Sequence, residues 1–494
     1  MPTPLAFRMP VLRWRVCFTK RRLPRPLSAF PLLDELGELD GWLDEHRILD
    51  GLPFLIDPEG RYDGELNQCF TGSWLRNSPR NTQAAVAYDL KKWLDFLSSS
   101  RGGQAGSTWH SATPEDRAAF EQWRRKDPRG PRVTDSTWDR EVATVNGFYR
   151  WAVREGFAAV NPLIQRLSRS RHRNGRDAAA ETPAEASHQG PRRDLKWLTA
   201  GMYRQWRDVG VRGFTAGGLP DASFRGRFAS RNAAFTDLMI RTGLRISEQV
   251  ALTLFELPEL VPGVANARTR LPNAIAKYGS GRAIYIPASA LRDVWDYVEM
   301  ERADAVEEAR AAGVYDRFPD PLIVEDRQRA RVRVDDDWVS VAQLDPQDRR
   351  RLLVRTAAGL EPAALWLTRQ GTPATVSSWQ QVFEDANGRC ERQGVPIRCH
   401  PHALRHSFAV ITLEQLWRGH LAELGTMNLD QRETYQMVFG DPLNWVRMRL
   451  GHRSVEITQI YLNPRELHQT GEKPQVAWSQ RETEALRSLY ELAV

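Results

Sequence analysis

One stretch of this chain, residues 164–193, holds too few large apolar side chains to bury a core. Arg, Ser, Ala, Gly and Pro dominate it, as in SRSRHRNGRDAAAETPAEASHQGPRR. Such a composition is typical of segments that connect folded domains. The 494 residues also exceed what one hydrophobic core usually organises. We therefore expect a linker at 166–194 with folded domains on both sides of it.

Apolar residues before this linker recur at helical spacing. Between Asn81 and Leu97 they repeat every three or four residues, and two further patterns pass through Phe120 and through Trp138 to Ala152. These patterns predict a small all-helical domain at 76–165. Residues 1–75 form an extension that reads as folded, because GLPFLIDPEGRYDGELNQCF is not low in complexity. Six basic side chains on the helices are candidates for phosphate contacts or for a solvated face: Lys91, Lys92, Arg124, Arg140, Arg150 and Arg154.

The second domain is expected to span residues 195–476. Asn232 to Arg241 reads as a helix that ends at Thr242-Gly243, where glycine permits a left-handed turn. A second helix is predicted from Ile246 through Val250 to Leu254, so that Arg245 lies between two packed elements. A fixed arginine at such a junction is suited to phosphate recognition.

A lysine lies in the next motif of this domain. The strand-like runs at 274–278 and 283–286 flank Gly279-Ser280-Gly281-Arg282, which predicts a β-hairpin with Lys277 near its tip. Only seven of the 69 basic residues are lysines. An amine loses its proton more readily than a guanidinium, so Lys277 is a candidate general acid, although a hairpin lysine is more often a solvated charge.

Composition restricts the compartment and the class of partner. No window approaches the roughly 20 apolar residues of a membrane helix, and basic residues and Pro10 interrupt any signal-peptide core. The cysteines fit neither a disulfide framework nor a paired zinc site, so a reducing cytoplasm is expected. The net charge of +7 is compatible with a polyanionic partner.

Two late motifs bring further candidates. In CHPHALRHSFAV, His402 and Arg405 are three residues apart, on one face of a helix that begins near Pro401. In RMRLGHRSVEITQIYLNP, His452 precedes Tyr461 by nine positions, and a proline ends the element.

These motifs resemble the tyrosine recombinase, or phage integrase, family, whose boxes occur here in the family's order. The matching segments are TGLRISE at 242–248, AKYGSGRAIYIP at 276–287, HALRH at 402–406, LGH at 450–452 and IY at 460–461. The helical region upstream is similar to the family's core-binding domain. The resemblance implies a mainly α fold with a small β-sheet (α+β), in which a core-binding domain and a catalytic domain close around duplex DNA.

The resemblance also implies a role for each residue of the motifs. Arg245 and Arg405 would bind the scissile phosphate, and His402 and His452 would add hydrogen bonds and proton handling. Lys277 would protonate the departing 5'-oxygen, and Tyr461 would form a 3'-phosphotyrosyl link. The expected chemistry uses no metal or other cofactor. The expected assembly is a homotetramer on two DNA sites, with accessory or directionality proteins as further partners.

Two spacings are longer than the family's usual pattern, and both are interpreted as insertions. They lie near 302–364 and 417–441. The first is interpreted as a surface excursion, with a DNA contact and a protomer contact as the alternatives. A C-terminal helix at 477–494 is expected to dock on a neighbouring protomer, as the family resemblance implies.

Three other classes of function compete with recombination. A type IB-like topoisomerase would use similar chemistry, and a catalytically silent DNA-binding regulator would keep the fold; the complete set of motifs argues against the regulator. A metal site would use Cys399, His400, His402 and His406, which cluster within eight positions. That site lacks an HExxH glutamate and leaves the other motifs unexplained.

Overall fold

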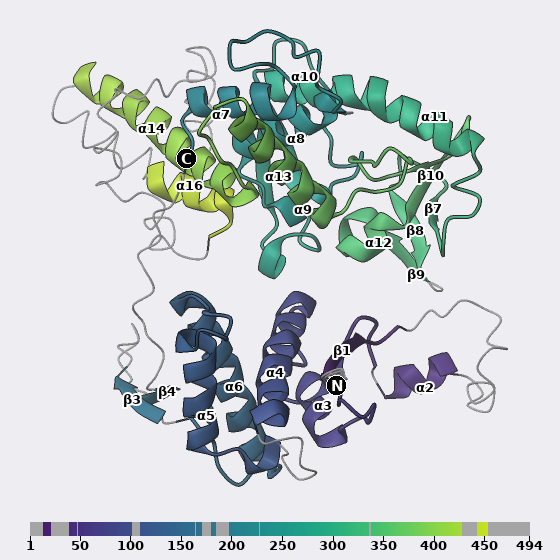
Figure 1. Cartoon of the computed structure of the whole chain (residues 1–494). Helices are drawn as coiled ribbons and strands as arrows, with labels where there is room; N and C mark the ends of the chain where they lie inside the picture. Colours follow the sequence, from purple (N-terminus) through teal and green to yellow (C-terminus); the bar gives the residue numbers. More distant parts are fainter. Residues whose placement is uncertain are drawn as a thin grey trace, which may run out of the picture. The chain divides into compact units, whose positions relative to one another are not determined.

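The computed structural model describes residues 13–20, 39–46, 48–100, 109–163, 165–169, 179–183, 197–226, 228–334, 337–426 and 442–452. The chain divides into two compact units, Met1–Arg193 and Asp194–Val494 (Figure 1). Each unit has its own core. Helices predominate in both and the sheets have two or three strands, which confirms the predicted fold class. None of the described helices is long and apolar enough to cross a bilayer.

The N-terminal unit is a group of helices with a small antiparallel ribbon. Its elements are β1 (Arg15–Phe18), α2 (Leu39–Glu45), β2 (Pro53–Ile56), α3 (Gly64–Thr71), α4 (Arg80–Ser100), α5 (Pro114–Glu121), α6 (Asp135–Glu155), β3 (Gln165–Arg169) and β4 (Ala179–Pro183). β1 pairs with β2, and β3 pairs with β4 inside the segment expected to be a linker. The three helices predicted from apolar spacing correspond to α4, α5 and α6.

Aromatic side chains form the centre of this unit. Trp93 of α4 is fully buried, meets Phe120 of α5 edge to face at 5.1 Å between centroids, and donates its indole N–H to the Tyr149 hydroxyl at 3.1 Å. Trp14 and Leu55, next to and within the β1–β2 ribbon, belong to the same core. The ribbon and the helices therefore fold as one body.

Most of the basic residues predicted on these helices have acidic partners. Arg124 is buried and forms a two-pronged ion pair with the buried Glu141, which Lys92 also contacts at 2.9 Å. Arg140 pairs with the buried Asp89. These ion pairs join α4, η3 (Gln122–Lys126) and α6. The phosphate-contact interpretation is therefore unsuited to Arg124.

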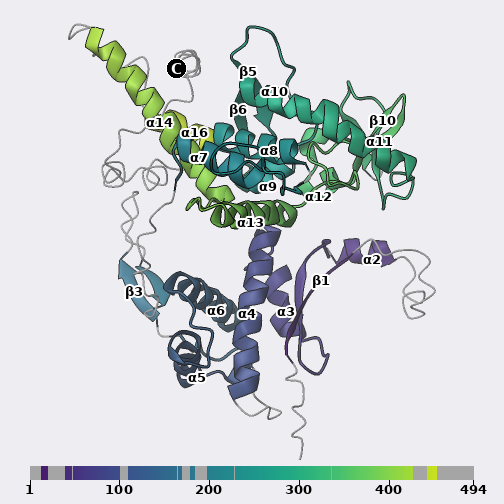
Figure 2. The ribbon, with the colours of Figure 1, turned by 45° about the horizontal axis from the view of Figure 1, so that its top comes forward.

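The C-terminal unit packs helices around α8. Its elements up to the insertion are α7 (Ala200–Trp206), α8 (Ala229–Thr242), α9 (Ile246–Val250), β5 (Asn266–Leu271), β6 (Arg282–Pro287), α10 (Ala288–Tyr297) and α11 (Ala303–Ala311). After it come α13 (Val376–Arg392), α14 (Pro401–Thr426) and α16 (Pro442–Leu450). α8 contacts both α10 and α14 (Figure 2).

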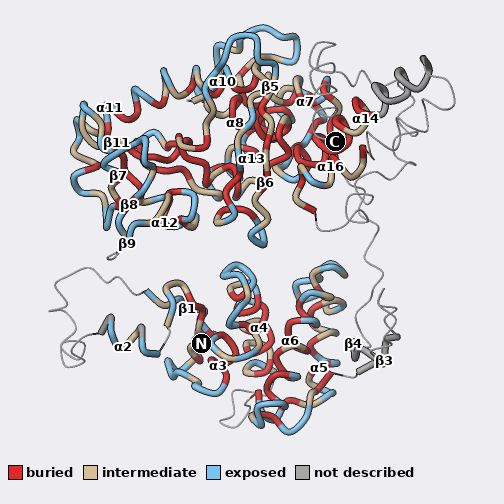
Figure 3. Tube along the Cα trace, turned by 180° about the vertical axis from the view of Figure 1, so that it is seen from behind, coloured by how far each residue is buried: buried red, intermediate tan, exposed pale blue. Residues whose placement is uncertain are grey.

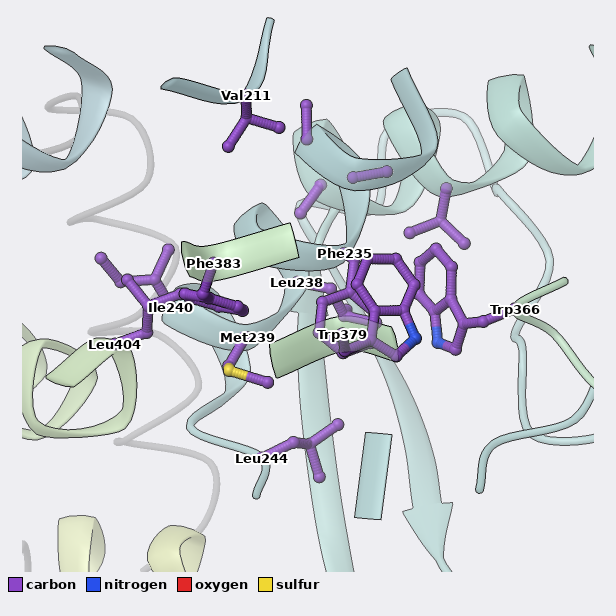
Figure 4. Packing of buried hydrophobic residues seen from close by; sticks show 14 of the residues in the cluster. Val211, Phe235, Leu238, Met239, Ile240, Leu244, Trp366, Trp379, Phe383 and Leu404 are labelled. Atoms are coloured by element: carbon purple, nitrogen blue, oxygen red, sulfur yellow. The ribbon is translucent and has the colours of Figure 1, made fainter. Parts of the chain in front are cut away.

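A stack of aromatic rings ties α8 to α13. Phe235 and Trp379 lie parallel with centroids 3.5 Å apart, and Trp366 meets both rings edge-on (Figure 4). All three side chains are buried. This core fixes α8, whose C-terminal end leads directly into the TGLRISE motif at 242–248.

The predicted insertion is a folded body. Between α11 and α13 lie β7 (Leu322–Val324), β8 (Arg331–Val334), β9 (Asp337–Ser340), α12 (Pro346–Arg350), β10 (Leu352–Thr356) and β11 (Gly359–Pro362). Apolar side chains such as Val324, Val332 and Leu352 form a separate buried cluster, and Figure 3 colours residues of β7 and β10 as buried. The apolar side chains of these strands alternate with exposed ones, as they do in half-buried strands.

The insertion is anchored to the rest of the unit by buried arginines. Arg349 forms a two-pronged ion pair with Glu256, with N–O distances of 3.0 and 3.1 Å. Arg302 is also buried and donates to the carbonyls of Pro362 and Ala364, so the two ends of the insertion are held together.

Candidate active site

Arg405 lies at the centre of the candidate site. It belongs to the first turns of α14, and its side chain is only 1% exposed. Its guanidinium donates to the carbonyl of Gly243 and to that of Leu450, and one of its nitrogens lies 3.2 Å from Nε2 of His452. One side chain thus joins three motifs that are far apart in the sequence.

Gly243 gives Arg405 its first acceptor. The residue caps α8 with φ of 65°, a left-handed conformation that favours glycine. A Cβ at this position would lie 2.4 Å from the ring of Phe408 on α14. The Thr-Gly pair therefore both ends α8 and lets α14 approach closely enough for Arg405 to reach the carbonyl.

His452 follows α16 after a second left-handed glycine, Gly451. The histidine is 7% exposed, and the guanidinium of Arg447 donates to its carbonyl at 3.0 Å. Burial, followed by the positive charges of Arg405 and Arg245, lowers the pKa of His452 to about 3. The imidazole is therefore neutral at pH 7. Because arginine has no acceptor, Nε2 accepts the contact from Arg405 and Nδ1 carries the proton.

Arg245 is the N-cap of α9, where it lies partly exposed beside Glu248. The backbone N–H of Arg245 donates to the Glu248 carboxylate at 3.0 Å and its guanidinium donates at 2.7 Å. Glu248 is completely buried. Burial by itself would raise the pKa of Glu248, but hydrogen bonding and charge from Arg282, with the charge of Arg245, lower it to about 2. A buried carboxylate thus holds Arg245 in place.

Arg282 joins the same carboxylate from the other side. Its guanidinium donates to Glu248 at 2.7 Å, and its Nε donates to the carbonyl of Arg449 at 2.7 Å. Sequence reasoning missed Arg282 and Glu248. Both stand inside the quoted motifs, and the signal for Glu248 was its position three residues after Arg245, which is the spacing of a capping box.

The predicted hairpin exists, but its first strand is elsewhere. β5 is Asn266–Leu271, and it pairs with β6 from Asn266↔Pro287 to Leu271↔Arg282. Residues 274–278 lie in the connection, which begins at Pro272, where no ladder N–H is available. The strand prediction for 274–278 was wrong for that reason. The second predicted helix was also too long, since α9 ends at Val250 and Thr253 bridges to Ala364.

Lys277 lies in this connection and is exposed. Its backbone N–H lies 3.5 Å from the Glu248 carboxylate, and its ammonium lies 4.9 Å from the centroid of the Tyr278 ring. Glu248 is therefore a common neighbour of Arg245, Arg282 and the Lys277 backbone.

Two of the predicted site residues remain, His402 and Tyr461. His402 is exposed in the first turn of α14, with its ring 4.3 Å from that of the buried His406. Tyr461, the end of the second insertion and the predicted C-terminal helix lie outside the described residues. The structure thus brings together Arg245, Arg405 and His452, with the Lys277 loop adjacent.

The alternative metal site does not form among the residues that the structure describes, since no three His, Cys, Asp or Glu side chains gather there. Cys399 is buried, and its sulfur faces the His400 carbonyl at 3.7 Å. Burial raises the pKa of this thiol well above its ordinary value. The cysteine is thus a poor thiolate ligand.

We expect acid to destabilise this unit through its histidines. Burial lowers the pKa of His452 and of His406 to about 3, whereas both would titrate near 6.5 in the unfolded chain. Between these values the unfolded state binds more protons, so the free energy of unfolding falls as the pH decreases from about 6.5 towards 3. Urea unfolding across this range measures the slope. A His452→Asn variant should lose part of it, and an unchanged slope would contradict the assignment.

The chain matches one family model and one curated relative over limited regions. Residues 75–156 match the phage integrase N-terminal SAM-like domain. A stretch of 110 residues, 22% of this chain, is 34% identical to the tyrosine recombinase XerC of Haemophilus ducreyi. The chain thus spans about a quarter of that relative's length, 27%.

Several solved structures are also similar to this chain, at low sequence identity. The XerH site-specific recombinase bound to palindromic difH substrate has a TM-score of 0.43 at 13% identity, covering 80% of this chain and 81% of that one. The Tn1549 transposon integrase with circular intermediate DNA has a TM-score of 0.44 at 12% identity. The match covers 80% of this chain and 93% of that one. A lambda integrase dimer bound to a COC' core site has a TM-score of 0.38 at 13% identity. The match covers 82% of this chain and 94% of that one.

The family model and the curated relative agree in the class of protein that they indicate. The model covers the helical region that contains α4, α5 and α6. Residues 75–156 are thus similar to a phage integrase domain, and a stretch of 110 residues is similar to a tyrosine recombinase.

Proposed function

We propose that this chain is a site-specific DNA recombinase that cuts and rejoins duplex DNA through a 3'-phosphotyrosyl intermediate. The observation that carries the proposal is the position of Arg405, whose buried guanidinium contacts Gly243, Leu450 and His452. Those residues come from the TGLRISE and LGH motifs, so one buried guanidinium joins them to the HALRH motif. The expected role is integration or excision of a mobile element.

In this proposal Arg245 and Arg405 bind the nonbridging oxygens of the scissile phosphate. Both are held in place before substrate arrives, Arg245 by Glu248 and Arg405 by two carbonyls. Pre-positioned donors stabilise the charge that develops in a five-coordinate transition state without the cost of reorganisation. The neutral His452 and the exposed His402 complete the hydrogen bonds around the phosphate.

Proton transfer and nucleophilic attack are assigned to Lys277 and Tyr461. Lys277 is exposed on the loop beside Glu248, where it can protonate the 5'-oxygen that leaves. The Tyr461 oxygen attacks phosphorus, the P–O5' bond breaks, and the energy of the phosphodiester is retained in the phosphotyrosyl link. A 5'-hydroxyl from another strand then reverses the step. No cofactor takes part in this scheme.

The proposal includes the organisation and partners of the chain. Residues 76–165 serve as the core-binding domain and 195–476 as the catalytic domain, with 166–194 between them. The protein works in the cytoplasm on duplex DNA, as a homotetramer on two sites. Accessory or directionality proteins and the docking of residues 477–494 on a neighbouring protomer belong to the same scheme.

We expect the purified chain to form a covalent adduct with DNA in the presence of EDTA. The substrate is a nicked duplex that carries the candidate attachment site, because loss of the short strand beyond the nick traps the phosphotyrosyl link. The adduct is measured as a band that survives denaturation. Tyr461→Phe removes only the nucleophilic oxygen, so it should abolish the adduct and leave DNA binding nearly intact.

Three results would count against the proposal, two from this experiment and one from a plasmid assay. An adduct that persists in Tyr461→Phe assigns the nucleophile to another residue. A folded preparation that binds the duplex without any adduct favours a silent regulator. Relaxation of supercoiled plasmid with no strand exchange between two sites would favour the topoisomerase alternative.

A further inference from the structure

The hairpin β8–β9 of the insertion has one face with a distinct composition. In the antiparallel register Arg331 is opposite Ser340 and Arg333 is opposite Trp338. Because side chains alternate along a strand and paired residues share a face, these four project to one side. Val332, Val334, Asp337 and Val339 project to the other. We call the first set the arginine–tryptophan face.

The two faces have different surroundings. Val332 is 1% exposed and packs in the buried cluster of the insertion, with Val334 and Val339 beside it. On the opposite side Arg331 and Arg333 are exposed, and Trp338 is 65% exposed. The valines thus pack the hairpin onto the core of the insertion. Arg331, Arg333 and Trp338 are exposed on the opposite side.

Among the residues of β8 and β9 that the structure describes, no carboxylate belongs to the arginine–tryptophan face. Asp337 lies on the valine side by its pairing with Val334. Two further exposed arginines, Arg327 and Arg329, precede the strand, and Arg329 pairs with Asp326 at 3.2 Å. A face with two arginines and an exposed aromatic ring is suited to bind a nucleic acid.

The position of the hairpin connects it with the candidate site. η7 (Val341–Gln343) follows β9 directly, and Ala342 and Gln343 line one groove together with Pro272, Asn273 and Ala274. Those three residues begin the connection that carries Lys277. Arg270 lines the same groove. A DNA duplex whose scissile phosphate is near Lys277 therefore has the insertion beside it.

We infer that the arginine–tryptophan face of the insertion binds the phosphate backbone of duplex DNA that flanks the cleavage point. The inference rests on the proposed function, which makes duplex DNA the substrate. Arg331 and Arg333 are two residues apart on a strand, a spacing of about 6.6 Å, so their guanidiniums reach different phosphates. A second copy of this chain, with its net charge of +7, is a less suitable occupant.

The test compares the salt dependence of DNA binding for the full-length chain and two double variants. Arg331→Gln/Arg333→Gln removes two charges from the face, and Arg350→Gln/Arg355→Gln removes two charges from α12 and β10 of the same insertion. Fluorescence anisotropy with a long labelled duplex of arbitrary sequence gives the dissociation constant from about 50 to 200 mM salt. Thermal unfolding checks that all three proteins are folded.

Removal of the two face arginines should lower the log–log salt slope by about 1.8, since each phosphate contact contributes about 0.9. Affinity of the wild type should then fall about tenfold more than that of the variant across this salt range. The α12/β10 variant should keep the wild-type slope. Equal changes in both variants would overturn the inference, because they would reflect net charge alone.

Two further results separate this inference from the proposed function. If the wild type forms the Tyr461 adduct and the face variant keeps the full salt slope, the inference fails and the recombinase proposal stands. If the face variant keeps its slope but loses self-association in sedimentation, the face binds another copy of the chain and the inference also fails. If the wild type binds no DNA, both proposals fail together.

Discussion

Glu248→Gln is expected to lower the free energy of unfolding of the C-terminal unit by about 3–5 kcal/mol, the usual cost of breaking a buried ion pair. Glutamine keeps the shape of the side chain but removes the charge that faces Arg245 and Arg282. Because Arg245 is then less well held, we also expect the rate of adduct formation to fall about 10²-fold. Urea unfolding and a time course of the DNA adduct measure the two effects.

The pH dependence of the same variant gives a second check. The pKa of Glu248 is lowered to about 2 in the folded protein, so its stabilising effect is complete above about pH 4.5 and is lost as the pH falls towards 2. The difference in unfolding free energy between wild type and variant should therefore shrink below about pH 4.5. A difference that stays constant from pH 7 to pH 3 would show that the carboxylate's charge is not the cause.

Glu256→Gln is the matched control. Glu256 is nearly buried and pairs with Arg349 through two contacts, but it faces the insertion. We expect it to lower stability to a similar degree while the adduct still forms at a rate close to that of the wild type. Equal losses of adduct in both variants would mean that Glu248 acts through global stability only.

Arg405→Lys is expected to reduce the rate of adduct formation by about 10²–10³, the usual effect of removing one donor to a developing negative charge. Lysine keeps the positive charge but cannot reproduce the planar set of donors that reaches Gly243, Leu450 and His452 together. Quenched-flow or manual sampling with the nicked duplex measures the rate, and anisotropy shows that DNA is still bound.

Arg302→Lys separates chemistry from folding in this comparison. Arg302 is also a buried guanidinium that donates to two backbone carbonyls, those of Pro362 and Ala364. Its replacement should lower stability as Arg405→Lys does, since both leave buried carbonyls without their donors. If the two variants lose adduct formation equally, Arg405 has no role beyond packing.

The helices and the arginine motif could be predicted from local patterns. α4, α6 and α8 follow apolar spacing, and the end of α8 follows from a glycine whose left-handed conformation is encoded by its residue type. Arg405 and His452 could be selected as residues, but their contact could not be deduced. It depends on the close approach of α14 to Gly243, which is a property of tertiary packing.

The missed features share a physical cause, which is dependence on distant partners. The first strand of the hairpin was placed at 274–278, because alternation alone does not show that Asn266–Leu271 is the segment that pairs with β6. Arg282 was read as a turn residue, and its contact with Glu248 links positions 34 apart. The fold of the insertion was missed because its buried valines are separated by charged residues, as expected of strands with one solvated face.

The hydrogen bonds that Arg302 donates to Pro362 and Ala364 affect how the protein tolerates changes in the length of the insertion. Because that side chain binds carbonyls at the far end of the insertion, the chain departs from the catalytic unit and returns to it at nearly the same point. The closure entropy of such an excursion rises only slowly with its length. A change in the length of the surface turns between these two points therefore need not move α10 relative to α13.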